Sequence, residues 1–309
     1  MANMLTGVHE ELDEHIRNLG YFGEHLGLTG LIPANGGDIS ILLGEEAAEA
    51  VLRGFKPQSE LILFRRLSEL VHIRRDGRTH YNAESVPEEI TQDLIRPLAG
   101  RVVVITATGA KLWDIARHPE RRLCVLEVNP DGRGFHLLYG NREYGLIPSI
   151  ETLSHLVALA TTLKEGAGSA SAFHAHPPAL VAVDAHMSVR GSYEELNKIL
   201  FSQKEGVLTN LSDLVGVVPY EPSGSKALLE KSIESIQQHR FTLWERHGVF
   251  IRERSFERCI DLLEYAEDAA KAALRALLNP EAFLGLTRQD VERAVQLYNI
   301  NPRILDLLG

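Results

Sequence analysis

The stretch SAFHAHPPALVAV, residues 171–183, places two histidines one residue apart at the end of an apolar segment. Residues 170–176 have the pattern of a β-strand, in which positions i and i+2 face the same side. The two prolines that follow are typical of the first turn of a helix. We therefore expect a strand that ends in His174 and His176, with both rings on one face, and a helix directly after it.

The rest of the chain alternates between strand-like and helix-like segments. Apolar or alternating runs predict extended segments at residues 36–44, 60–69, 100–109, 121–141, 213–220 and 241–253. Amphipathic runs predict helices at residues 5–27, 44–55, 149–163, 192–203, 223–240, 255–278 and 287–308. In the third of these helices we expect Ser149 to be the N-cap residue. The segments at 121–141 and 241–253 each contain a tight turn, which indicates hairpins and therefore antiparallel pairing.

No repeat, low-complexity tract or domain linker interrupts this pattern. The sequence therefore predicts a single α/β domain over residues 1–309, with a central, mostly antiparallel or mixed β-sheet between helical layers. An N-terminal helix at about residues 5–27 and C-terminal helices at about residues 255–308 should pack on that sheet.

Composition excludes several classes of partner. The chain is 44% apolar and 24% charged, as expected for a protein with a hydrophobic core. Its formal net charge of −10 argues against nucleic acid and anionic membrane surfaces. No apolar run is long enough to span a bilayer, and residues 1–20 lack the apolar core of a signal peptide. Cys124 and Cys259 stand far apart in apolar segments, which favours reduced core cysteines in a cytoplasmic protein.

The paired histidines suggest a metal site. Neutral imidazole is the commonest protein ligand for zinc, and a catalytic zinc needs about three protein ligands with one position left open. His247, in WERHGVF, follows an apolar strand and precedes a glycine that lets the chain turn, so it is the candidate third ligand. The alternative is that these are ordinary core histidines of an unrelated α/β protein.

Two turns and one acid are further candidates. PANGGDIS, residues 33–40, offers Asn35 and Asp38 next to two glycines, which would allow a ligand to approach the backbone closely. TATGAK, residues 106–111, could form an anion-binding turn from the side chains of Thr106 and Thr108 and the N–H groups of Gly109 and Ala110. Glu151 stands at the start of a predicted helix. Alternatively, both turns are plain surface turns, and Glu151 is an acid favoured by the helix dipole.

Taken in order, the segments NGGDIS, TATGAK, IPSIE, HAH and RHGVF resemble the zinc-dependent class II aldolase and adducin family over about residues 30–275. The connecting segments at residues 126–141 and 214–250, and the C-terminal helix at 286–300, are most similar to its rhamnulose-1-phosphate aldolase members. The resemblance implies a metal-dependent carbon–carbon lyase that cleaves L-rhamnulose 1-phosphate to dihydroxyacetone phosphate and L-lactaldehyde. Other members cleave fuculose 1-phosphate, epimerise pentulose phosphates at C4 or dehydrate methylthioribulose 1-phosphate, and these activities remain alternatives. A scaffold like the adducin head, without catalysis, is an alternative of another class.

The resemblance also assigns roles to residues. It implies one Zn²⁺ per chain held by His174, His176 and His247, with Glu151 as the general acid/base or as a fourth ligand in the resting enzyme. The phosphate site that it implies is lined by Asn35, Gly36, Gly37, Thr108 and Gly109. It further implies a homotetramer with sites at subunit borders, where Glu205 could be a second acid; the alternative for Glu205 is a solvated acid at a helix end.

The chain departs from the family at Asp38, where an asparagine is usual. An ionised carboxylate repels each negative charge of a phosphate dianion by about 1 kcal/mol at 4 Å even in water. We therefore expect Asp38 to point away from the phosphate, to bind sugar hydroxyls, or to accompany a different or unphosphorylated ligand.

Overall fold

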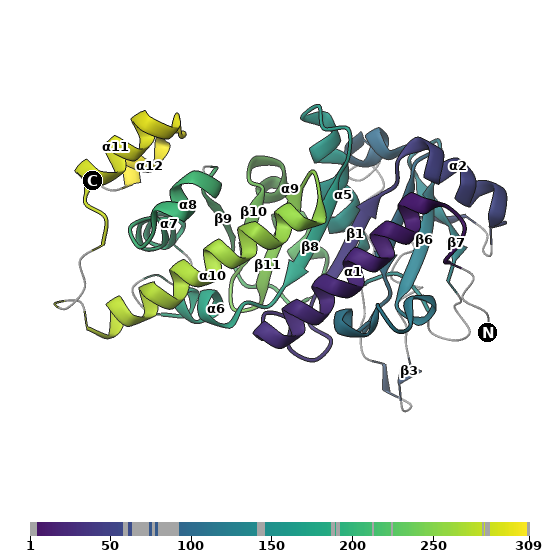
Figure 1. Ribbon diagram of the computed structural model, residues 1–309, viewed down its shortest axis with the longest axis horizontal. Helices are drawn as coiled ribbons and strands as arrows, with labels where there is room; N and C mark the ends of the chain where they lie inside the picture. Colours follow the sequence, from purple (N-terminus) through teal and green to yellow (C-terminus); the bar gives the residue numbers. More distant parts are fainter. Residues whose placement is uncertain are drawn as a thin grey trace.

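The computed structural model describes residues 5–57, 61–63, 74–75, 78–79, 93–140, 146–186, 189, 192–211, 213–223, 225–279, 281 and 285–307. Within them, nine strands form one sheet in the order β2-β7-β6-β5-β1-β8-β11-β10-β9 (Figure 1). Neighbouring strands are antiparallel except β9 and β10, which are parallel. The predicted α/β fold with a mostly antiparallel sheet is therefore confirmed.

The strands of this sheet are β1 (Asp38–Leu42), β2 (Ile62–Leu63), β5 (Val102–Thr106), β6 (Leu123–Val128), β7 (Gly134–Tyr139), β8 (Ser171–Ala175), β9 (Val215–Val218), β10 (Phe241–Trp244) and β11 (Gly248–Glu253). A separate two-stranded sheet consists of β3 (Arg74–Arg75) and β4 (Arg78–Thr79). The extended segment expected at residues 60–69 is represented by β2, and most of the remainder lies outside the described residues.

The helices are α1 (Glu10–Thr29), α2 (Glu45–Gly54), α5 (Thr152–Lys164), α6 (Pro178–Asp184), α7 (Tyr193–Phe201), α8 (Glu205–Asn210), α9 (Lys226–Gln238), α10 (Phe256–Leu278), α11 (Arg288–Tyr298) and α12 (Arg303–Leu307). Short 3-10 turns are η2 (Arg96–Leu98), η3 (Leu112–Asp114) and η4 (Pro119–Arg121). None of the helices in the described part of the chain is long and apolar enough to cross a membrane.

Apolar side chains fill two cores, one on each face of the sheet. In β5, Val102 and Val104 belong to the core beneath α1 and α10, whereas Val103 and Ile105 belong to the core beneath α5 and α9. This division follows from the strand geometry, because successive side chains point to opposite faces. It explains why β5 reads as a continuous apolar run rather than an alternating one. In Figure 1, α1 and α10 run across the near face of the sheet.

The central strand β8 sets the position of the histidines. It pairs with β1 on one side and β11 on the other, and His174 is in register with both Asp38 and Phe250. The side chains of Asp38, His174 and Phe250 therefore share the face that α5 covers. Because β8 and β11 are antiparallel, the end of β8 lies beside the start of β11, where His247 stands.

Candidate metal centre

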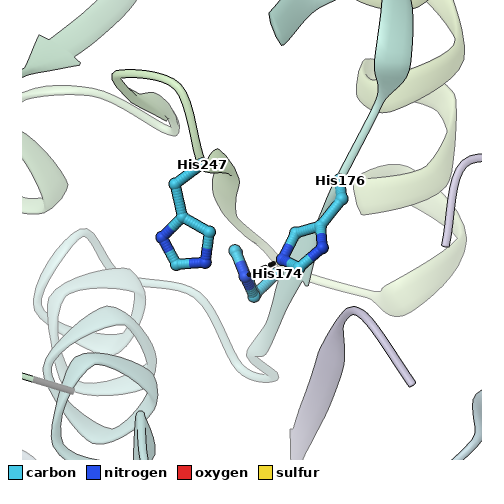
Figure 2. Close-up of side chains that lie close together, drawn as sticks. All are labelled: His174, His176 and His247. Atoms are coloured by element: carbon cyan, nitrogen blue, oxygen red, sulfur yellow. Dashed lines mark hydrogen bonds between the residues drawn. The ribbon is translucent and has the colours of Figure 1, made fainter. Parts of the chain in front are cut away.

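Three histidines from two separate segments meet at this end of the sheet (Figure 2). His174 lies in β8, His176 follows the strand, and His247 lies in the turn between β10 and β11. One ring nitrogen from each lies within 4.8 Å of those of the other two. The structure thus brings together the three histidines that the sequence singled out, 71 residues apart at their nearest point (247 − 176).

Two glycines leave the space that the rings occupy. A Cβ atom on Gly36 would lie 2.5 Å from His176 Nδ1, and one on Gly248 would lie 2.8 Å from His176 Cδ2 and 2.3 Å from the Ala175 carbonyl oxygen. At these three distances, a residue with a Cβ atom would require the histidine ring or the backbone to shift. The approach of a ligand to the paired glycines Gly36 and Gly37 stays a prediction.

The histidine rings are oriented by one backbone group and one aromatic neighbour. His174 Nδ1 lies 2.8 Å from the Val249 carbonyl oxygen and donates its proton there, which leaves the Nε2 lone pair directed at the other histidines. The Nε2 atoms of His174 and His176 face each other at 2.8 Å. The buried Trp244 ring packs against His174, with ring centroids 4.8 Å apart, and against His247 at 5.3 Å.

The protein environment keeps these rings neutral. Burial lowers the pKa of His174 well below its ordinary value, and the neighbouring histidines His247 and His176 lower it further. Burial also lowers the pKa of His176, and it lowers the pKa of His247 to about 4 with a contribution from His176. Neutral imidazole is the form that binds a metal. His247 Nδ1 is moreover buried without a hydrogen-bond partner among the described residues. Three converging neutral imidazoles with an unsatisfied nitrogen fit a zinc-type ion.

Glu151 lies beside this cluster at the start of α5. Its carboxyl group is buried; Oε1 accepts a hydrogen bond of 3.0 Å from the Ser223 hydroxyl, and Oε2 has no partner within the described ranges. Oε2 lies 3.7 Å from His174 Nε2. Burial raises the pKa of Glu151 well above its ordinary value, the charge of Asp38 raises it further, and the Ser223 hydrogen bond lowers it. The raised pKa favours the protonated form of Glu151, and its unpartnered oxygen lies beside the histidines.

The prediction that Ser149 is the N-cap of α5 is wrong, because the helix begins two residues later. Glu151 occupies the N-cap position of α5 without making a side-chain cap bond. Ser149 instead accepts the Glu151 N–H at 3.1 Å, and its own hydroxyl donates to Asp38. A local serine turn therefore replaces the cap, because the Ser149 hydroxyl is held by Asp38.

Asp38 anchors a buried polar network rather than facing the solvent side of its turn. Its Oδ1 lies 2.6 Å from His155 Nε2, and His155 Nδ1 lies 2.8 Å from the Ser40 hydroxyl. Burial alone would raise the pKa of Asp38, but its charge interaction and hydrogen bond with His155 prevail and lower the pKa to about 2. Asp38 is therefore a carboxylate at neutral pH, and both of its oxygens are hydrogen-bonded within the protein.

In the two turns predicted to bind an anion, some polar groups are already hydrogen-bonded within the protein, whereas others remain exposed or partly exposed. Thr106 is buried and its oxygen accepts the Ile39 N–H at 3.0 Å, and the Ala110 N–H donates to Ala107 O. These two groups of the expected anion turn are thus already used. The Thr108 hydroxyl donates to the Pro148 carbonyl at 2.7 Å. Asn35 is exposed at the tip of its turn, and Gly109 is half-buried. A phosphate role for Asn35, Gly36, Gly37, Thr108 and Gly109 stays a prediction.

Glu205 does not join the histidines within one chain. It is the first residue of α8, a helix that packs against α10 and α11. The Tyr298 hydroxyl of α11 donates a hydrogen bond to its carboxylate. Any catalytic role for Glu205 would therefore require a neighbouring subunit.

Sequence reasoning missed three residues that contact the candidate acid or its network. Ser223, in the segment after β9, holds Glu151 Oε1 although 72 residues separate them. Ser149 and His155 complete the network around Asp38. The only sequence signal for His155 was its position one helical turn after Glu151, on the buried side of α5.

Known proteins resemble this chain in sequence and in fold. The model of the class II aldolase and adducin N-terminal domain matches residues 17–274. Rhamnulose-1-phosphate aldolase from Listeria welshimeri is 27% identical over 209 residues, 67% of this chain and 74% of that protein. The enzyme of that name from Klebsiella pneumoniae is 26% identical, covering 66% of this chain and 74% of that protein. A sugar-phosphate aldolase from Thermotoga maritima has the same fold, with a TM-score of 0.62 at 24% identity over 86% of this chain and 95% of that one. The chain belongs to the class II aldolase and adducin family.

Proposed function

We propose that this chain is a zinc-dependent aldolase that cleaves a ketose 1-phosphate, with L-rhamnulose 1-phosphate as the substrate. The products would be dihydroxyacetone phosphate and L-lactaldehyde. The observation that carries the proposal is the buried, unpartnered Glu151 Oε2, which lies 3.7 Å from one of three converging neutral histidines. The names of the rhamnulose-1-phosphate aldolases with 26–27% identity support the choice of substrate.

His174, His176 and His247 would hold the metal, one ion per chain. A bound zinc ion supplies Lewis acidity: it polarises the ketose carbonyl and stabilises the negative charge that develops on neighbouring oxygens during cleavage. Cleavage of the C3–C4 bond turns the C4 hydroxyl group into the aldehyde and leaves the bonding electron pair on C3. Glu151 would take up the proton that the C4 hydroxyl releases and deliver a proton to C3, and Ser223 would hold its other oxygen in place.

The remaining roles follow from family membership. Asn35, Gly36, Gly37, Thr108 and Gly109 would line the phosphate end of the substrate. Residues 1–309 would act as one domain in the cytoplasm, assembled as a homotetramer. In that assembly Glu205 would approach the active site of a neighbouring subunit. Sedimentation of the zinc-loaded protein as a monomer would contradict the tetramer and, with it, the role of Glu205.

The test is an assay of product release. The zinc-loaded protein is incubated with L-rhamnulose 1-phosphate, and dihydroxyacetone phosphate is coupled to NADH oxidation by glycerol-3-phosphate dehydrogenase. We expect NADH oxidation that stops when a chelator is added and returns when zinc is restored. If zinc binds at one ion per chain but no triose phosphate forms, L-rhamnulose 1-phosphate is not the substrate, and L-fuculose 1-phosphate and other sugar phosphates are tested in the same assay. A C4 epimer or loss of water would then identify an epimerase or a dehydratase.

A further inference from the structure

The short helix α6 contacts both segments that carry the histidines. It directly follows the segment of His174 and His176, and its last residue, Asp184, contacts the turn that carries His247. It begins two residues after His176 and ends at Asp184, and it packs against α10 (Figure 1). Two carboxylates, one at each end of α6, are almost completely buried: Asp184 and Glu267 are each 1% exposed. Neither belongs to the histidine cluster, and the proposed reaction uses neither. Buried carboxylates are costly unless they are hydrogen-bonded, so the bonds they make are informative.

Glu267 fixes the first turn of α6. The residues at the helix start, Pro177 and Pro178, cannot cap the helix with their side chains, and no side-chain cap bond is present there. Glu267, on α10, accepts the Ala179 N–H at 3.1 Å with one oxygen and the Leu180 N–H at 2.9 Å with the other. The end of the histidine segment is thus attached to α10 at the residues that immediately follow His176.

Asp184 fixes the turn that carries His247. Its Oδ2 accepts the Arg246 N–H at 2.9 Å, across 62 residues of sequence. Arg246 has a φ of +58°, in the left-handed region that residues other than glycine rarely adopt. It lies inside a tight turn in which the His247 N–H donates to the Trp244 carbonyl at 3.0 Å. The conformation of Arg246 sets the direction in which the next residue, His247, leaves the turn.

We propose that α6 is a positioning element that holds His176 and His247 at a fixed separation, with Glu267 and Asp184 as the two positioning residues. The proposal rests on the proposed metal site. The hydrogen bond that Asp184 accepts from the Arg246 N–H keeps Arg246 in its left-handed conformation, so that His247 is preorganised before metal arrives. Without this bond the turn can relax, and metal binding must restore its geometry. Residues that orient metal ligands in this way typically change metal affinity by about 10- to 100-fold.

The first experiment measures zinc affinity by competition with a fluorescent chelator, in the full-length protein. We expect Asp184→Ala to bind zinc about 10- to 100-fold more weakly than the wild type. Asp184→Asn should stay close to the wild type, because the amide oxygen can still accept the Arg246 N–H. Glu253→Ala is the matched control: Glu253 is also buried, but it pairs with Arg240 at the opposite end of β11. The control should bind zinc like the wild type even if its melting temperature falls.

A second pair of variants tests the conformation itself and does not disturb the interior, because the Arg246 side chain is partly exposed. Arg246→Asn and Arg246→Val both remove the guanidinium group that packs over Tyr220. Asparagine tolerates the left-handed region, whereas the β-branched valine does not. We expect the Val variant to bind zinc several-fold more weakly than the Asn variant. The visible absorption spectrum of bound Co²⁺ should also change in the Val variant alone, because it reports ligand geometry.

Three results would decide against the positioning role. They are wild-type zinc affinity in Asp184→Ala, equal weakening in Glu253→Ala, and equal affinities in the two Arg246 variants. Failure of the proposed metal site looks different, since the wild-type protein itself would then bind no stoichiometric zinc. Failure of the proposed reaction would appear as zinc-loaded wild-type protein that releases no triose phosphate, and it would leave the differences in zinc affinity between the variants unchanged. If Asp184→Ala does not fold, the Arg246 pair alone decides.

Discussion

Both ends of the β8–β11 pair carry buried charged or titratable groups, but only one end leaves them without partners. At the histidine end, Glu151 Oε2 and His247 Nδ1 are buried and unpartnered among the described residues. At the other end, the buried Arg252 donates to both oxygens of Glu165 at 2.7 and 2.8 Å and to the Ile236 carbonyl at 2.6 Å. Arg240 likewise pairs with Asp213 and Glu253 there.

The difference teaches which feature identifies the site. The arginine end borders a cavity of about 480 Å³, so a cavity with charged walls is not sufficient. Polar atoms that are paired within the protein stabilise the fold, whereas unpaired buried ones cost free energy unless a ligand satisfies them. A bound ligand would therefore stabilise the unpartnered polar atoms at the histidine end, whereas the charged groups at the arginine end are already paired.

The largest expected effect comes from Glu151→Gln. Removing a general acid should lower kcat by about 10²- to 10⁴-fold, while zinc affinity changes only a few-fold because the three histidines remain. Steady-state kinetics and zinc titration of the same preparation check both halves. A Gln variant with full turnover would mean that another group moves the proton.

The next effect separates the cluster from the other histidines. We expect His247→Ala to weaken zinc binding by at least about 100-fold, beyond the usual effect of a residue that merely orients a ligand. His136→Ala is the control, since His136 lies on β7 with β6, β5 and β1 between it and β8. Zinc should then raise the melting temperature of the control but not of the His247 variant. Equal responses of the two variants would remove His247 from the site.

Asp38 predicts a smaller effect that depends on pH. The pKa of Asp38 is about 2 in the folded protein and 3.8 for an unperturbed aspartate, so its carboxylate stabilises the fold above pH 3.8. This contribution, about 2 kcal/mol, is lost as the pH falls through 2. Urea unfolding of the metal-free protein between pH 6 and 2.5 should therefore show a steeper loss of stability for the wild type than for Asp38→Asn. Parallel curves of the free energy of unfolding against pH would show that the ionisation of Asp38 does not contribute to stability.

The smallest effect is expected at the arginine end. Glu165 is half-exposed, so Glu165→Gln should change the free energy of unfolding by about 1 kcal/mol or less. Zinc affinity and turnover should not change. If this variant weakened zinc binding as much as His247→Ala, the histidine end and the arginine end would not be independent of each other.

Local patterns predicted most of the elements around the site. The apolar runs at 100–109 and 170–176 became β5 and β8, and the spacing of His174 and His176 placed both rings on one side. These predictions succeed because strand periodicity is a property of neighbouring residues. The third histidine of the cluster, His247, was also identifiable from its turn, since a glycine follows it.

The polar contacts around the cluster were not predictable in the same way. Ser223 contacts Glu151 across 72 residues and Asp38 contacts His155 across 117, and no local pattern encodes pairings at that distance. The sequence left Asp38 with three possible roles because its neighbours were unknown. The sheet order, in which β1 lies between β5 and β8, is what turns Asp38 toward His155 and away from solvent.

Each of the two cores contains one cysteine, so the opening of each core can be measured separately. Cys124 lies in the core beneath α5 and α9, and Cys259 lies in the core beneath α10. Burial raises the pKa of both thiols, so neither offers a reactive thiolate while its layer is closed. The rate at which a thiol reagent labels each cysteine thus reports how often the core around that cysteine opens. Because the histidine end lies on the Cys124 side of the sheet, zinc should slow the labelling of Cys124 more than that of Cys259.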